Sequence, residues 1–397
     1  MKIVILVGDG MGDFPVDELN GLTPLQAAYT PTLQKIASSG DLRMVQTVPS
    51  NLPPGSDVAN MALLGYDAKE NYTGRAPIEA AGANIKMTSS NIAFRCNFVS
   101  IVDDIMCDYS AGHISSKESA ELIKSLKMNL TNNEINFFNG VQYRHILMTN
   151  GLGENVKCYP PHEIIDKNIN EFLPTGSDAD KIIDLMKKSE KILECHPINL
   201  ARIKEGKTPA SHIWLWGQGR QMQLESYENL YGLSGGIISA VDLLKGLANL
   251  AGLEAPDIDG ATGFIDTNYK GKVESALEIL QHNDFVFVHI EAPDECGHLG
   301  DAKLKTKAIE LFDSEVCLPV LNWLEEKNDP YLLILSMDHR TPVALKGHTS
   351  DPVPMAALHG PVLNFKNDKH FDENVNNGIS QGMAYKWIQE LLSNSLN

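Results

Sequence analysis

Three short apolar runs, far apart along the chain, constrain the fold more than any other feature of the sequence. They lie at Lys2–Val7, Phe285–Ile290 and Tyr331–Ser336, and each has the length of a fully buried strand. Helical patterns accompany them at 23–39, 238–250, 272–281 and 303–326. Buried apolar strands that alternate with helices are typical of a parallel sheet covered on both faces. We therefore expect an α/β core whose parallel sheet is flanked by helices.

The middle of the chain follows a different pattern. Residues 91–102, 105–109 and 141–149 alternate like half-buried strands, and 116–127 and 178–194 are helical. This mixture predicts a smaller α+β domain inserted into the larger one. We place the inserted domain at 91–209 and the core domain at 1–90 and 210–397.

The amino-acid composition argues against certain classes of binding partner. The 397 residues include 51 acidic and 33 basic side chains, a net charge of −18, and such a surface repels a phosphate backbone, so no nucleic-acid partner is expected. No run of about 18 apolar residues occurs, so no membrane partner is expected either. The first apolar run ends at Gly8 without a cleavage site, which favours a strand over a signal peptide. Six scattered cysteines without a C-x-x-C pair indicate mostly buried, reduced thiols of a cytoplasmic protein.

Acidic and histidine side chains follow each of the three apolar runs. Because the carboxyl ends of parallel strands meet at one edge of a sheet, where α/β proteins bind ligands, these side chains should converge. Alone, an Asp after a strand is often a helix cap and a loop His is often structural. Together, mixed Asp and His groups suit divalent ions such as Mn²⁺, Zn²⁺ or Mg²⁺. The candidate ligands are Asp9, Asp294, His298, Asp338, His339 and His348.

Ser56 is the candidate nucleophile. It follows a stiff Pro-Pro-Gly loop and opens a helical run at 58–64. A serine at a helix start can simply be an N-cap. Alternatively, the helix N-terminus and a metal can stabilise its alkoxide and receive a phosphate.

The glycines at 8–12 also need comparison with a dinucleotide-binding loop. Gly8-Asp9-Gly10-Met11-Gly12 follows a strand, as that loop does. However, the third glycine position holds Asp13, and the Asp9 carboxylate would repel a pyrophosphate. We therefore interpret Asp9 as a metal ligand and expect no nicotinamide cofactor.

Several motifs carry a family resemblance. They include VGDGMGD at 7–13, PPGSDVANMALLGYD at 53–67, YTGRAPIEAAGA at 72–83, HIEAPDECGHLGD at 289–301, DHRTPV at 338–343 and KGHTSDPVP at 346–354. In these motifs the chain resembles the archaeal-type branch of the cofactor-independent phosphoglycerate mutases, within the alkaline phosphatase superfamily, and the resemblance covers nearly the whole chain.

The resemblance implies two divalent metal ions, most readily Mn²⁺, with Zn²⁺, Mg²⁺ or Co²⁺ as alternatives. One site would hold Asp9, Ser56, Asp338 and His339, and the other Asp294, His298 and His348. It also implies that Ser56 is transiently phosphorylated while a small phosphorylated substrate, 3-phosphoglycerate, becomes 2-phosphoglycerate. No 2,3-bisphosphoglycerate would be needed, and the inserted domain would close over the substrate.

Substrate contacts are expected within the matching motifs. A phosphorylated carboxylic acid needs several cations, although each such residue can equally form a structural ion pair. The substrate-binding candidates are Arg75, Arg144, His145, His162, Arg220 and Lys346, and His113 is the candidate general acid.

Other functions are compatible with the same metal ligands and the same serine nucleophile. A relative with another acceptor, such as a homoserine kinase, would keep the metals and Ser56, although no G-x-x-x-x-G-K-[ST] loop is present. In a phosphatase or phosphonate hydrolase, water would reach the phosphoserine, and an inserted lid argues against this. A catalytically silent binding protein is disfavoured because the set of metal residues is intact.

Overall fold

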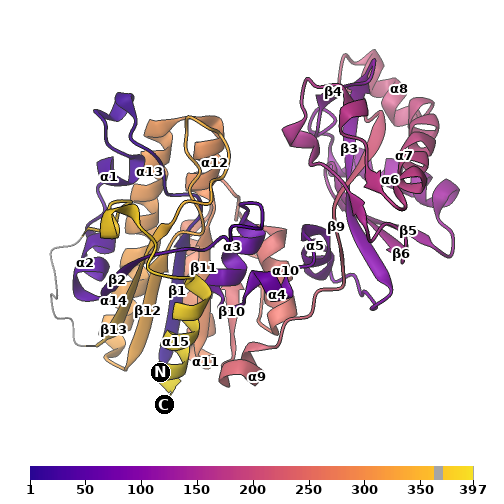
Figure 1. The fold of residues 1–397 in the computed structure, drawn as a ribbon. Helices are drawn as coiled ribbons and strands as arrows, with labels where there is room; N and C mark the ends of the chain where they lie inside the picture. The colour runs from indigo at the N-terminus through magenta and orange to yellow at the C-terminus, as the bar shows by residue number, and fades with distance from the viewer. Residues whose placement is uncertain (362–369, 397) are drawn as a thin grey trace. The chain divides into compact units, whose positions relative to one another are not determined.

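The computed structural model describes residues 1–361 and 370–396, and the chain forms two compact units (Figure 1). Unit 1 comprises Met1–Tyr72 and Leu224–Asn397, and unit 2 comprises Thr73–Gln223. Unit 2 is therefore an insertion. It extends beyond the limits of 91 and 209 expected from the sequence because helix α5 (Arg75–Gly82) packs on strands β3 (Asn91–Val102) and β9 (His212–Arg220).

Unit 1 is built on a six-stranded sheet. The strand order is β10 (Gly235–Ile238), β11 (Phe285–Ile290), β1 (Lys2–Gly8), β12 (Tyr331–Ser336), β13 (Val353–Gly360) and β2 (Asp41–Val45). The first four strands are parallel, and β13 runs antiparallel to both neighbours. The three apolar runs predicted as strands are thus adjacent, as β11, β1 and β12. Every residue of β11 and β12 is buried, which explains why these strands are apolar apart from His289 and Ser336.

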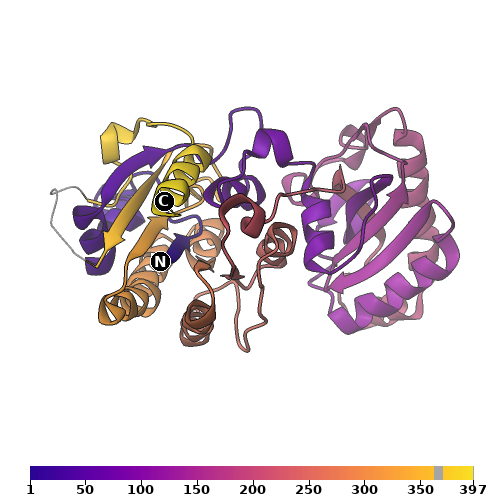
Figure 2. The same cartoon turned by 90° about the horizontal axis from the view of Figure 1, so that it is seen from below.

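Helices cover both faces of this sheet (Figure 2). The α-helices of unit 1 are α1 (Pro24–Ala27), α2 (Pro31–Ser39), α3 (Ser56–Leu63), α4 (Ala68–Asn71), α9 (Tyr227–Tyr231), α10 (Asp242–Ala251), α11 (Tyr269–His282), α12 (Ala292–Leu299), α13 (Ala302–Leu311), α14 (Leu318–Lys327) and α15 (Ala384–Leu396). The α/β class predicted for the core is confirmed.

Two predicted helices are each divided. The pattern at 23–39 forms α1 and α2, because Pro31 cannot continue the preceding helix and instead starts a new one. The pattern at 303–326 is interrupted by a π-helical segment, Phe312–Cys317, between α13 and α14.

Unit 2 has a five-stranded antiparallel sheet with helices. Its order is β4 (Ile105–Asp108), β3, β6 (Arg144–Asn150) and β5 (Ile135–Val141), with β9 also paired to β3. Its other α-helices and strands are α6 (Ser116–Leu130), α7 (Ala179–Glu194), α8 (Pro197–Lys204), β7 (Val156–Lys157) and β8 (Thr175–Gly176). A separate core that includes Phe94, Phe98, Phe137 and Trp214 supports the unit.

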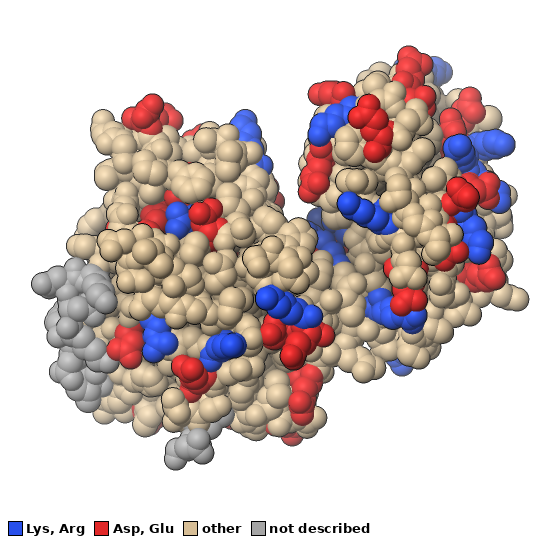
Figure 3. Space-filling view, viewed as in Figure 1, with Lys and Arg blue, Asp and Glu red and all other residues tan. Residues whose placement is uncertain are grey.

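Acidic and basic side chains are interspersed on the viewed face of each unit (Figure 3). All six cysteines are free thiols, and Cys96, Cys296 and Cys317 are buried. The cysteines agree only in part with the expectation of mostly buried thiols, because Cys107 and Cys195 are exposed and Cys158 is half-buried. Among the described helices, none combines the length and apolar character needed to cross a membrane.

Candidate active site

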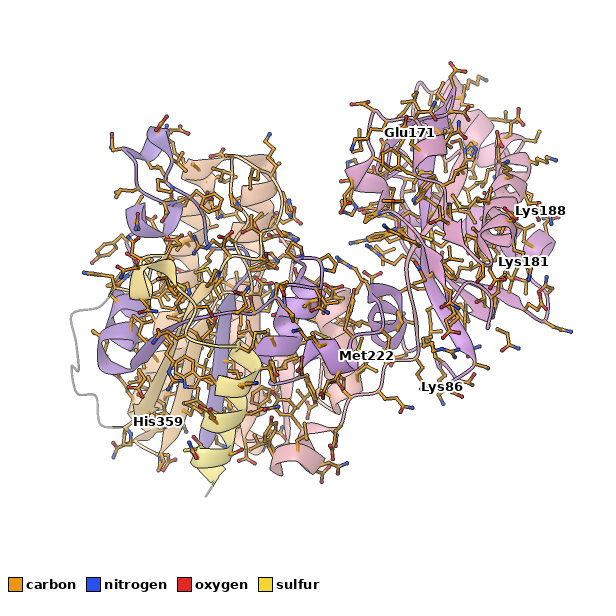
Figure 4. All side chains as sticks on the ribbon, in the orientation of Figure 1. Lys86, Glu171, Lys181, Lys188, Met222 and His359 are labelled. Carbon is orange, nitrogen blue, oxygen red and sulfur yellow. The ribbon has the colours of Figure 1, made fainter. Side chains whose placement is uncertain are left out.

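The candidate ligands of unit 1 gather at one edge of its sheet. Asp9 follows β1 directly, Asp338 and His339 follow β12, and Asp294 lies in α12, which begins just after β11. His348 lies in the loop before β13. By contrast, His359 of β13 pairs with Leu332 at the beginning of β12, at the opposite end of the sheet (Figure 4).

One group consists of Asp294, His298 and His348. Nε2 of His298 lies 3.2 Å from Oδ2 of Asp294 and 3.0 Å from Nε2 of His348. Nε2 of His348 lies 3.4 Å from Oδ1 of Asp294. The spacing of Asp294 and His298 by one helical turn on α12 places both on one side of the helix, as their sequence positions predicted.

A second group consists of Asp9, Asp338, His339 and Ser56. Nε2 of His339 lies 3.6 Å from Oδ1 of Asp9, 3.4 Å from Oδ2 of Asp338 and 3.1 Å from the Ser56 hydroxyl. Asp9, Asp338 and His339 are almost completely buried, whereas Ser56 is half-buried. Four polar groups from three distant segments thus converge on one small volume.

The chemistry of both groups fits divalent cations. Nδ1 of His298 faces the carbonyl oxygen of Lys346 at 3.0 Å, and Nδ1 of His348 faces that of Pro54 at 3.4 Å. A carbonyl oxygen only accepts hydrogen bonds, so each Nδ1 carries a proton, and Nε2 is the ring atom that can bind a metal once it is deprotonated. In the second group, buried Oδ1 of Asp9 makes no hydrogen bond within the described residues. An unsatisfied buried carboxylate oxygen is costly unless a cation pairs with it.

Burial and mutual repulsion control the protonation of these groups. Burial raises the pKa of Asp9 well above its usual value, and the nearby charges of Asp338 and Asp294 raise it further. Burial lowers the pKa of His339 to about 4, so this imidazole is neutral at pH 7 and able to bind a metal. Burial also lowers the pKa of His298, but hydrogen bonding to Asp294 outweighs it and raises that pKa to about 9. A proton therefore holds the place that a metal ion would take.

Ser56 does not cap its helix. Helix α3 begins at Ser56, its N-cap is Gly55, and no side chain caps it. The N-cap interpretation is therefore wrong, and the Ser56 hydroxyl is directed at His339 instead. Asn60, one turn later, donates through Nδ2 to the carbonyl oxygen of Ser56 at 2.9 Å and to Oδ2 of Asp338 at 3.0 Å.

Gly10 permits the close approach of the two groups. Its φ is +61°, and a Cβ atom there would lie 2.5 Å from Oδ1 of Asp294 and 2.5 Å from Oγ1 of Thr341. Any side chain at this position would push the strand ends apart.

Three supporting residues were not identified from the sequence. Besides Asn60, these are Thr341 and His289, whose Nε2 lies 3.1 Å from Oδ2 of Asp9. The available signals were weak: Asn60 lies four residues after Ser56 on the same helix, and His289 is a polar residue next to the end of the otherwise apolar run of β11.

In unit 2, two candidate substrate contacts, Arg75 and Arg144, lie near Glu79. Its carboxylate pairs with Arg95 at 2.8 Å and with Arg75 at 3.1 Å. Burial raises the pKa of Glu79, but Arg95 and Arg75, with a smaller contribution from Arg144, lower it overall. Three guanidinium groups near one carboxylate leave a net positive charge. The ring of His162 lies edge-on to Trp216, and the guanidinium of Arg95 lies 4.1 Å from the centre of the same indole.

The other candidates have different surroundings. His145 is buried, accepts a hydrogen bond from the Gly140 N–H at Nδ1, and has no partner at Nε2 within the described chain. Arg220 pairs with Glu154 and donates to the carbonyl oxygen of Ser89. His113 of unit 2 and Lys346 of unit 1 are exposed, and both have positive φ.

Comparison with known proteins was made for the whole chain. The profile of 2,3-bisphosphoglycerate-independent phosphoglycerate mutases matches residues 37–199. A protein of that name from Methanosarcina barkeri is 47% identical over 374 residues, 94% of each chain, and one from Methanothrix thermoacetophila is 49% identical over 356 residues, 90% of each chain.

Solved structures agree with these relatives. The PH0037 protein from Pyrococcus horikoshii is 28% identical with a TM-score of 0.81, covering 100% of this chain and 97% of that chain. A cofactor-independent phosphoglycerate mutase from Thermoplasma acidophilum is 26% identical with a TM-score of 0.65, covering 100% of both chains. The resemblance inferred from the sequence motifs is confirmed, and this chain belongs to the 2,3-bisphosphoglycerate-independent phosphoglycerate mutase family.

Proposed function

We propose that this protein interconverts 3-phosphoglycerate and 2-phosphoglycerate without 2,3-bisphosphoglycerate, through transient phosphorylation of Ser56. The names of the relatives support the reaction. The observation that carries the mechanism is the 3.1 Å separation of the Ser56 hydroxyl from Nε2 of His339, within a buried group of carboxylates. A serine held at a helix start beside metal-ligating groups has the surroundings of an activated nucleophile.

Two divalent ions, for which we propose Mn²⁺, would be held by the two groups. One would be bound by Asp9, Ser56, Asp338 and His339, and the other by Asp294, His298 and His348. When bound, such ions lower the pKa of the serine hydroxyl and offset the charge of the phosphoryl oxygens. The carboxylate share of the donor set supports Mn²⁺ over softer ions.

The protein's own residues would act as follows. Oγ of Ser56 gives its proton to solvent and bonds to the phosphorus of 3-phosphoglycerate, while the bond from phosphorus to the 3-oxygen breaks. Glycerate stays bound, its 2-hydroxyl then attacks the phosphoserine, the bond from phosphorus to Oγ breaks, and Oγ of Ser56 takes a proton back from solvent. An acid–base group must protonate the departing 3-oxygen and accept the proton of the 2-hydroxyl, and we propose His113 for this role.

Binding of the substrate requires cations for its carboxylate and phosphate. The positive charge around Glu79 supports Arg75 and Arg144, His162 contacts the same Trp216 ring as Arg95, and Lys346 is an exposed cation of unit 1. His145 and Arg220 have less support, because one is buried and the other is already paired. Unit 2 would thereby supply most of the substrate recognition.

The deciding assay measures formation of 2-phosphoglycerate from 3-phosphoglycerate with Mn²⁺ present and 2,3-bisphosphoglycerate absent. The expected result is turnover that disappears in Ser56→Ala but persists in Ser38→Ala, where Ser38 is a serine of helix α2 whose hydroxyl donates to the carbonyl oxygen of Lys35. Phosphate release in place of 2-phosphoglycerate would instead identify a phosphatase, and ATP-dependent phosphorylation of homoserine a kinase. Either result would overturn the proposed acceptor.

A further inference from the structure

Thr341 lies between the two candidate metal groups. Its hydroxyl donates to Oδ1 of Asp294 in the first group and lies 3.2 Å from Nδ1 of His339 in the second. The side chain is completely buried. One hydroxyl therefore contacts a proposed ligand of each ion.

The direction of both hydrogen bonds follows from the chemistry of the partners. An ionised carboxylate only accepts, so the Thr341 hydroxyl donates its proton to Asp294. The hydroxyl oxygen then accepts from Nδ1–H of His339. This arrangement leaves the lone pair of the His339 ring on Nε2, the atom that faces Ser56 and Asp9.

The position of Thr341 is held by its backbone. Its N–H donates to the carbonyl oxygen of Gly12 at 3.1 Å, and its carbonyl oxygen accepts from Nζ of the buried Lys305 at 2.8 Å. Lys305 also binds the Gly12 carbonyl oxygen and Oδ2 of Asp13, each at 2.8 Å. A Cβ atom at Gly297 would lie only 2.4 Å from the Thr341 carbonyl oxygen. These contacts fix the backbone of Thr341 and thereby hold its hydroxyl between Asp294 and His339.

We propose that Thr341 is a positioning residue that couples the two metal sites. It orients Asp294 for one ion and selects the metal-binding tautomer of His339 for the other. Loss of this hydroxyl therefore weakens both sites, although it supplies no ligand to either. The inference rests on the proposed binding of two divalent ions by these groups.

The test is titration of metal-free protein with Mn²⁺, following free Mn²⁺ by electron paramagnetic resonance. Two variants remove the hydroxyl. Thr341→Val keeps the volume of the side chain, whereas Thr341→Ala makes the side chain smaller. An effect common to both variants therefore cannot come from a change in side-chain volume. Thr341→Ser retains the hydroxyl. The matched control is Thr47→Val, because Thr47 is also a buried threonine of unit 1 but its hydroxyl has no partner within the described residues.

We expect both sites to weaken by about 10- to 100-fold in Thr341→Val and Thr341→Ala, and to stay near the unsubstituted affinity in Thr341→Ser and Thr47→Val. Circular dichroism establishes that each variant is folded, and Thr341→Ala replaces Thr341→Val if the latter is not. Unchanged affinity, or weakening confined to one site, would overturn the coupling. Failure of the unsubstituted protein to bind two ions would instead overturn the proposed metal centre itself.

Discussion

Nδ2 of Asn60 lies 3.0 Å from Oδ2 of Asp338, while the same amide donates to the carbonyl oxygen of Ser56. Asn60 thereby joins the helix of the candidate nucleophile to a carboxylate at the end of β12. We expect Asn60→Leu to leave Oδ2 of Asp338 without a donor and to weaken Mn²⁺ binding by about 10- to 100-fold, with a parallel loss of turnover. Calorimetric titration with Mn²⁺ measures this.

Asn71→Leu is the matched control. Asn71 makes the same bond to the carbonyl oxygen four residues earlier, that of Asp67, and no bond to a candidate ligand is recorded for it in the described chain. Equal metal affinities in the two variants would show that the link to Asp338 has no role.

The Ser56→Ala variant should separate chemistry from folding. Because the Ser56 hydroxyl does not cap α3, its removal should change the free energy of unfolding by less than the ~1 kcal/mol that a lost N-cap costs. Transfer should nevertheless fall to background. Urea unfolding and the mutase assay, run on the same preparation, test both statements. Substantial turnover by Ser56→Ala would eliminate Ser56 as the nucleophile.

Removal of metal should stop turnover reversibly. Oδ1 of Asp9 is buried without a hydrogen bond in the described chain, and burial together with the charges of Asp338 and Asp294 raises the pKa of this carboxyl well above its usual value, so its ionised form needs a cation beside it. We expect chelation to abolish activity, added Mn²⁺ to restore it, and the melting temperature to rise with Mn²⁺ concentration. Activity that is indifferent to a chelator after dialysis would contradict a metal-dependent reaction.

The secondary-structure elements that were predicted well are those whose local sequence pattern is compatible with only one kind of structure. Strands β1, β11 and β12 are almost entirely apolar because both faces are buried, and the sequence shows this directly. The division of the 303–326 helix was not predictable, because a π-helical turn changes the periodicity by a single residue within an otherwise helical pattern.

In the candidate site, too, some residues could be predicted from the sequence pattern and others could not. Its candidate ligands lie at strand ends, and topology alone brings such positions together. The supporting contacts depend on tertiary packing, since Thr341 and Asp294 are 47 residues apart and Asn60 and Asp338 are 278 apart. A threonine or asparagine in a loop or helix has many ordinary roles, so its sequence position carries no comparable signal.

Arg144 is expected to act in substrate binding rather than in chemistry. Its guanidinium is exposed, lies 5.6 Å from the ring centre of Tyr143 and contributes to the positive charge near Glu79. Arg144→Gln should raise KM for 3-phosphoglycerate about 10- to 100-fold, the loss of one charge-assisted contact, with a smaller change in kcat. Lys124→Gln, which removes an exposed cation of α6, is the control. A KM equal to that of the control would exclude Arg144 from the substrate site.

His145 makes the stability of unit 2 depend on pH. Burial lowers its pKa to about 3 from the usual 6.5, and the Gly140 N–H donates to Nδ1, which favours the neutral ring. The unfolded chain therefore binds a proton below pH 6.5, whereas the folded unit does not until about pH 3. Its stabilising contribution is complete above pH 6.5 and declines as the pH falls, by about 2 kcal/mol between pH 7 and pH 5.

Hydrogen exchange of the β6 amides, corrected for the intrinsic effect of pH, measures this decline, and the β12 amides of unit 1 serve as the internal reference. The His145→Asn variant keeps an acceptor for the Gly140 N–H but cannot take up a proton, so its β6 amides should lose about 2 kcal/mol less than those of the unsubstituted protein over the same interval. If both proteins lose equal protection, protonation of His145 in the unfolded chain is not what makes unit 2 sensitive to acid.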